Sequence, residues 1–453
     1  MLFALSGMAI MTWAALVYGL IRPVRVVPVA EVSFWAPALL LPAFFLLPAS
    51  FAVLRTSGTA LIEQGLSSSN LLTIGIAGLS AMFILWNLIR YNRLSGLLHD
   101  RVLFPYYMTI GIAVCSTLWA IFPTYTIYRA IELAVMFTLV VLVLDRRDYA
   151  RAFVTLHVLI LGIWLLIQTP QIATSLASGI VFSSAKENLI PLLALSLLWF
   201  VWVYPRSTNF PLPVALLAIV AFIAAGSAAT VATIPVFVTG AMIASPNLLI
   251  RGLGVLASIG YFALFLFLLF GLSHFPDLVD IIAAALQKPP TELIKATGRN
   301  ELWPLFIEAS QYRSFGSGFA SERFLQLLVN LTAVQERLGQ KEIFFGSAHN
   351  MVIGTWLATG WLGLATMGLC LGAALREAMR LDAPARRFVI PILFALVVNG
   401  MTVQGIFGEF NYHTVTWAAV LVMIRVRLRA GAAPAAVRAP VRSTTSGQRR
   451  QYA

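Results

Sequence analysis

The chain has 453 residues, of which 60% are hydrophobic and 11% are charged, and its mean hydropathy is +0.87. This composition is far more apolar than that of a soluble domain, so it indicates lipid as the solvent of most of the surface. The formal net charge of +13 would suggest a nucleic-acid partner in a soluble protein. Here the basic residues fall between apolar runs, as the positive-inside rule of membrane proteins describes, and we expect no nucleic-acid partner.

Continuous apolar runs recur along the chain, with lengths near the roughly 20 residues that cross a bilayer as a helix. They do not alternate as barrel strands do, and helices satisfy their own backbone polar groups in hydrocarbon. The expected fold class is all-α, a polytopic transmembrane helical bundle of about 12–13 spans with one long, partly helical outer loop. The spans are predicted at residues 2–21, 34–54, 70–90, 103–122, 127–144, 150–168, 188–204, 211–225, 228–245, 251–272, 350–375, 388–405 and 412–426.

The chain divides into four regions on this basis. Residues 1–272 form a bundle of about ten spans, residues 273–349 form the outer loop, and residues 350–429 form the last spans. Residues 430–453 are Arg-rich without apolar periodicity, which predicts a disordered cytoplasmic tail on an anionic leaflet. An odd number of crossings then places the N-terminus outside.

Two amphipathic segments are expected in the outer loop. Leu278 to Leu286 would lie in the membrane interface, and the apolar residues between Phe324 and Leu338 follow helical spacing with charges between them. Neither an Asp-x-Asp motif nor a His or Cys cluster is present, so we expect no metal site. Cys115 and Cys370 both lie in apolar runs and are predicted to pack in the core.

The polar motifs lie near predicted outer ends of spans. Gly298-Arg299 and Trp303 give a Gly-Arg-x-x-x-Trp pattern, Gly316 and Gly318 flank a serine, and His349-Asn350 opens a span with spaced glycines. Upstream motifs are Leu118-Trp119 with Pro123 and Arg129, and a stretch containing Gly179, Phe182, Lys186 and Asn188.

In this order the motifs resemble the O-antigen ligase and polymerase superfamily of bacterial envelope glycosyltransferases. The upstream stretch with Lys186 is similar to the exopolysaccharide polymerase branch. One departure is that the family often has Ser-Arg-Gly where this chain has Ser227-Ala228-Ala229, so an arginine expected near the donor is absent. Family members usually have fewer spans, so the first helix would be an addition.

The resemblance implies a multi-pass protein of the bacterial inner membrane whose outer loop is a periplasmic catalytic loop. The donor would be a glycan on undecaprenyl pyrophosphate, and the acceptor a hydroxyl of a second glycan. No cofactor, metal or nucleotide sugar would be used. Other polysaccharide assembly proteins are candidate partners, and the C-terminus would be cytoplasmic.

Transfer from a pyrophosphate requires cations that stabilise the departing negative charge, and guanidinium groups supply bidentate donors that stay ionised. Arg299 and Arg129 are therefore the candidate donor-binding arginines, and Lys186 would add a point charge. The alternatives are a surface ion pair between Arg299 and Glu301, and a solvated loop lysine at Lys186.

The acceptor hydroxyl requires a base, and a neutral histidine can serve. His349 fits, because a position at the start of a span, with Asn350 at the cap, places imidazole near the positive pole of the helix and disfavours its protonated form. The alternative is a hydrogen-bonded interfacial histidine. Glu409 would assist or orient the base, or remain a solvated loop acid, and Trp303 would either anchor the loop by packing or stack on sugar.

The remaining histidines carry no predicted role: His274 and His413 are structural, and His157 makes a contact within its helix.

The competing functional class is a transporter or lipid-linked glycan flippase, in which the outer loop is only a gate. Charges at span ends and the absence of paired broken helices in the sequence favour the enzyme. A purely structural subunit of an envelope assembly is a third hypothesis.

Overall fold

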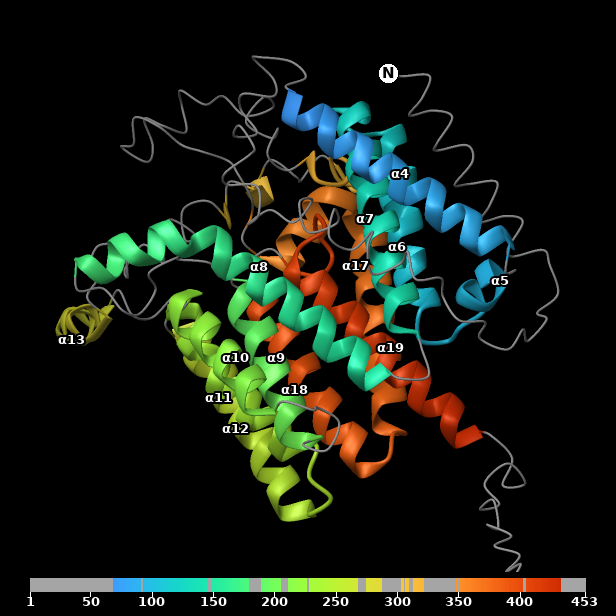
Figure 1. The fold of residues 1–453 in the computed structure, drawn as a ribbon. Helices are drawn as coiled ribbons and strands as arrows, with labels where there is room; N and C mark the ends of the chain where they lie inside the picture. Colours follow the sequence, from blue (N-terminus) through green and yellow to red (C-terminus); the bar gives the residue numbers. More distant parts are fainter. Residues whose placement is uncertain are drawn as a thin grey trace, which may run out of the picture.

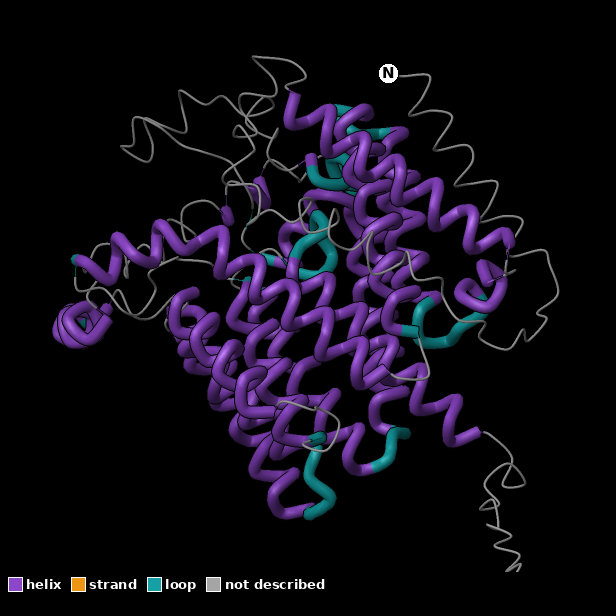
Figure 2. The backbone as a smooth tube through the Cα atoms, in the orientation of Figure 1, coloured by secondary structure: helices purple, strands orange, loops and turns teal. Residues whose placement is uncertain are grey.

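The computed structural model describes a helical protein (Figure 1). Helices and short connecting loops make up the described part of the chain, where no strand occurs (Figure 2). The first two predicted spans lie outside this part, and each of the other predicted spans overlaps a helix. The described residues are 68–90, 93–145, 149–178, 189–204, 211–225, 228–267, 274–286, 303–304, 306–308, 313–321, 348, 350–401 and 405–432.

Four of the described helices are long and apolar enough to cross a membrane, by length and composition: α7, α8, α17 and α18. Shorter apolar helices include α9, α10 and α12. The helix bounds are α4 Ser68–Arg90, α5 Arg93–Leu98, α6 Phe104–Cys115, the 3-10 turn η2 Ser116–Leu118, α7 Pro123–Leu144, α8 Tyr149–Ala177, α9 Ile190–Val203, α10 Pro211–Ala225, α11 Ala228–Ile243, α12 Leu248–Leu266, α13 Pro276–Leu286, α17 Met351–Met379, α18 Ala383–Gly400 and α19 Tyr412–Ala432.

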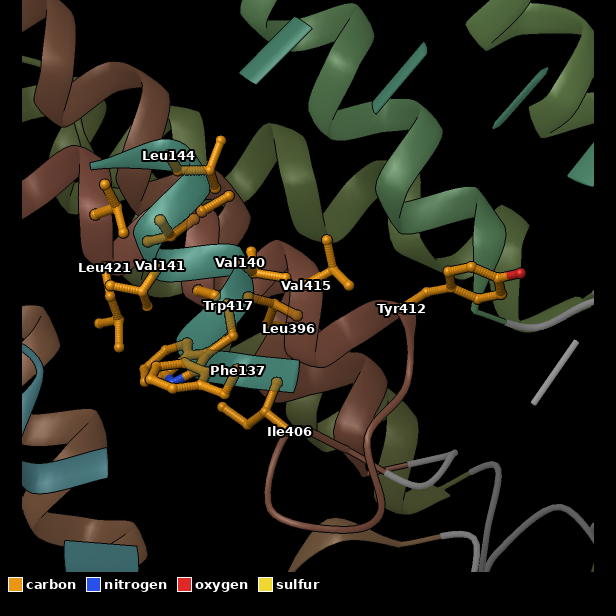
Figure 3. Packing of buried hydrophobic residues seen from close by; sticks show 14 of the residues in the cluster. Phe137, Val140, Val141, Leu144, Leu396, Ile406, Tyr412, Val415, Trp417 and Leu421 are labelled. Atoms are coloured by element: carbon orange, nitrogen blue, oxygen red, sulfur yellow. The ribbon is translucent and has the colours of Figure 1, made fainter. Parts of the chain in front are cut away.

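The centre of the structure is α7, which is buried on nearly every side. It packs against α4, α6 and α19, and α19 packs in turn against α18. Figure 3 shows Phe137 and Val141 of α7 beside Leu396 of α18 and Trp417 of α19. A helix that is apolar all round must be surrounded by other apolar groups, and here they are mainly the side chains of neighbouring helices.

The predicted interfacial segment is helical. Within α13, Val279 is buried, whereas Asp277, Leu278 and Ile281 are exposed. In Figure 1 this helix lies apart from the main bundle, near the far end of α8. The second predicted amphipathic segment, residues 324–338, lies outside the described residues.

One helix is broken in a way that the sequence analysis did not predict. Gly360 of α17 has φ 62° and ψ −149°, a conformation outside the helical region that glycine alone adopts readily. The break leaves the carbonyl groups of Leu357 and Ala358 without their helical partners. They accept instead from the backbone N–H groups of Ser317, at 2.7 Å, and Gly318, at 2.9 Å.

The predicted tail begins later than expected. The last helix continues to Ala432, and Arg425, at the end of the last predicted span, is buried within the bundle. Its guanidinium group contacts Asp100 and Asp145, each at 2.6 Å. A buried arginine needs carboxylate partners, and the two aspartates supply them from the ends of α5 and α7. Residues 433–453 lie outside the described part.

Candidate functional site

At the opposite end of the bundle from Arg425, a second buried charge cluster lies around Arg129, near the start of α7. Arg129 Nη1 donates to Glu132 Oε2 at 2.7 Å, and Nη2 lies 3.4 Å from Glu409 Oε2. Nε donates to the Tyr125 hydroxyl at 3.0 Å, and that hydroxyl donates to Glu409 Oε1 at 3.1 Å. The Tyr128 ring lies 5.8 Å from the guanidinium carbon, within cation–π range.

Glu409 is not the solvated loop acid that one prediction allowed. It is only 5% exposed, because the loop between α18 and α19 turns inwards and brings it to Arg129. The carboxylate thus compensates a buried arginine instead of facing water, as buried ions require. That Glu409 assists or orients a catalytic base stays a prediction.

A glycine loop, residues 313–321, joins α17 to the turn between α6 and α7. Gly316 and Gly318 have φ values of +77° and +100°, so both mark turns, as predicted. Trp119 Nε1 donates to the carbonyl of Phe315 at 2.6 Å, and Thr126 Oγ1 donates to the carbonyl of Phe319 at 3.0 Å. The predicted Leu-Trp motif and the predicted Gly-x-Gly motif, far apart in sequence, are therefore in direct contact.

Trp303 connects the first part of the outer loop to its end. Its Nε1 donates to the carbonyl of Ala348 at 2.8 Å, and the residue is 8% exposed. This burial supports the packing role of Trp303 over sugar stacking, since a stacking ring must present a face to the ligand. Ala348 is the residue immediately before His349.

Asn350 begins α17, as predicted. Its side-chain oxygen accepts from the backbone N–H groups of Val352 and Ile353, at 2.9 and 3.0 Å, which is the geometry of a helix N-cap. Its Nδ2 donates to the carbonyl of Met401 at 3.1 Å. The cap therefore also ties the first turn of α17 to the end of α18.

The loop after α18 lies against the same turn. A side chain added at Gly405 would meet Met351 Sδ at 2.7 Å, so only glycine permits this approach. Asn411 Nδ2 donates to the carbonyl groups of Gly405 and Glu409, at 3.3 and 3.0 Å. These bonds fix the loop that carries Glu409.

Of the predicted site residues, the structure brings together Arg129 and Glu409, and it links Asn350 to the Glu409 loop. His349, Arg299 and Lys186 lie outside the described residues, although the neighbours of His349 on both sides are placed. Sequence reasoning missed Glu132 and Tyr125. A carboxylate inside an apolar span is costly unless it has a partner, so Glu132, three residues after Arg129, was the available signal.

Two other histidines are buried in the bundle. His157 Nδ1 lies 2.9 Å from the carbonyl of Phe153, one turn earlier in α8, which confirms the predicted contact within the helix. His413 Nε2 lies 3.3 Å from Asn399 Nδ2. Within the described ranges no three His, Cys, Asp or Glu side chains form a group that could hold a metal ion.

Comparison with known proteins adds no family assignment. No protein-family model matches the chain, and no curated protein matches it. The contacts above are therefore the basis for a functional interpretation. They define a buried acid–arginine cluster and a glycine loop at the same end of the bundle as the start of α17.

Proposed function

We propose that this protein is a polytopic glycosyltransferase of the bacterial inner membrane that polymerises or ligates undecaprenyl-pyrophosphate-linked glycan at the periplasmic face. The observation that carries the proposal is the convergence of motifs that are distant in sequence. Trp119 contacts the glycine loop, that loop fills the break in α17, and Asn350 caps the same helix. An assembled site at one end of a bundle is where a transferase would meet a lipid-linked substrate.

The contacts between charged residues at the two ends of the bundle support the proposed topology. The predicted span bounds put Asp100, Asp145 and Arg425 on the same side, the side of the C-terminus, and these residues form one cluster. Arg129 and Glu409 were predicted on the outer side, and they form the other. If the helices did not cross the membrane in alternating directions, charged residues from the two predicted sides would lie together in one cluster.

In the proposed reaction, the acceptor hydroxyl oxygen bonds to the anomeric carbon of the donor while the bond from that carbon to the pyrophosphate oxygen breaks. His349 accepts the hydroxyl proton, and undecaprenyl pyrophosphate leaves with the bonding electron pair. Arg299 and Lys186 stabilise the charge that develops on the leaving group. Direct displacement inverts the anomeric centre, and the step requires no metal.

The test uses purified protein in lipid nanodiscs with an undecaprenyl-pyrophosphate oligosaccharide. We expect longer lipid-linked products from the wild type and none from His349→Ala at an equal protein level. His274→Ala is the matched control, because His274 is exposed and outside the proposed site. Chain growth by His349→Ala would reject the base assignment, and no growth by the wild type would reject the transferase.

One observation favours a flippase as the second candidate. Half-helices whose ends point into a membrane bundle often surround transporter sites, and α17 is broken at Gly360. A flippase would move labelled lipid-linked glycan across proteoliposomes without lengthening it. Product length therefore separates the two activities.

A further inference from the structure

The guanidinium group of Arg129 already contacts protein oxygens through each of its nitrogens. Each of its three guanidinium nitrogens faces an oxygen: Nε faces Tyr125, Nη1 faces Glu132 and Nη2 faces Glu409. The residue is 4% exposed. A phosphate ligand needs free donors that point at an accessible surface, and these contacts leave Arg129 poorly suited to that task.

The charge of the cluster also opposes anion binding. One guanidinium group faces two carboxylates, and Glu132 is 1% exposed. Glu132 Oε1 has no hydrogen-bond partner among the described residues. Since charges interact strongly where water is scarce, a pyrophosphate group approaching Arg129 would also meet the two carboxylates that already contact its guanidinium group.

The cluster nevertheless lies next to the proposed reaction site. Glu409 belongs to the loop between α18 and α19, which Asn411 holds through two carbonyl groups. The same loop packs through Gly405 on Met351. Arg129 therefore connects α7, through the Glu409 loop, to the first turn of α17.

We propose that Arg129, Glu132 and Glu409 form a positioning cluster that holds the loop between α18 and α19 against the start of α17. The cluster thereby sets the position of Asn350 and the first turn of α17, and it does not bind the donor phosphates. The inference rests on the proposed transferase function. In this proposal, cations of other segments, such as Arg299, bind the negatively charged pyrophosphate of the donor.

Two measurements separate positioning from phosphate binding. The first is the affinity of the purified protein in nanodiscs for undecaprenyl pyrophosphate, the sugar-free leaving group. The second is the rate of glycan elongation from a saturating lipid-linked oligosaccharide. For Arg129→Lys and Glu409→Gln we expect turnover to fall about 10- to 100-fold, since small displacements of reacting groups have effects of that size. We expect the affinity to stay within about twofold of wild type.

The opposite pattern would overturn the proposal. If Arg129 binds the donor, Arg129→Lys weakens undecaprenyl pyrophosphate binding, and Glu409→Gln strengthens it by releasing the guanidinium group. Unchanged turnover in both variants would also refute a positioning role. If the wild type neither binds this lipid nor elongates glycan, the failure lies with the proposed function instead.

The controls address folding. Glu377→Gln removes another buried carboxylate with arginine partners, at the other end of α17, and we expect its turnover to match wild type. If either main variant fails to fold, Tyr125→Phe keeps the ring beside Arg129 and removes only the bridging hydroxyl. Lower turnover with unchanged affinity in that variant would support positioning, and weaker affinity or unchanged turnover would refute it.

Discussion

Substitution of Gly360 by alanine tests the break in α17 directly. An alanine at φ 62° and ψ −149° occupies a region that is essentially restricted to glycine, which costs about 1–3 kcal/mol. Its Cβ would also collide with the carbonyl oxygen of Ser314 and lie 2.7 Å from Phe315 Cα, and overpacking typically adds about 1–3 kcal/mol. The expected loss is thus about 2–6 kcal/mol.

The loss should appear as release of the glycine loop and not as unfolding of α17. In a straight helix the Trp361 N–H would return to the carbonyl of Leu357, so the helix regains its bonds while the loop loses its own. Trypsin cleavage after Arg313 reports this release. At the lower limit of about 2 kcal/mol, cleavage should be about 30-fold faster when it follows the population of the opened loop.

The matched control is Gly368→Ala in the same helix, where an added Cβ meets nothing within 4 Å. Alanine is favoured over glycine in a helix by about 0.5–1 kcal/mol, so this variant should be as stable as wild type or slightly more so. Equal cleavage rates at Arg313 in the two variants would refute the reasoning that the break depends on Gly360.

Two further substitutions test the other contacts. Arg425→Gln leaves Asp100 and Asp145, whose side chains are 10% and 12% exposed, without their main partner. It should lower the free energy of unfolding by about 3–5 kcal/mol, whereas Arg429→Gln, whose side chain is 47% exposed, should change it by about 0–1 kcal/mol. Thermal unfolding in detergent measures both, and equal losses would contradict the burial argument. Trp303→Phe removes the hydrogen bond to Ala348 and should cost about 0.5–1.5 kcal/mol; the same assay would show no change if that bond contributes nothing.

The glycine loop was only partly predictable from sequence. Gly316 and Gly318 were predicted to mark a turn, since glycine is the usual residue at positive φ. Their partner was not predictable, because the carbonyl groups of Leu357 and Ala358 become available only after Gly360 breaks α17. The same glycine is compatible with an unbroken helix, and a tertiary contact decides between the two.

The sequence by itself determined the helical class, the approximate bounds of the described helices and the cap at Asn350, because apolar runs and capping residues act over one or a few turns. It also separated the charged residues into two ends. Only the tertiary structure decided that Glu409 is buried and that Arg129 shares its charge with Glu132 and Glu409. The contact between Arg129 of α7 and Glu409, about 280 residues later, depends on how the helices pack, and local sequence patterns do not encode that packing.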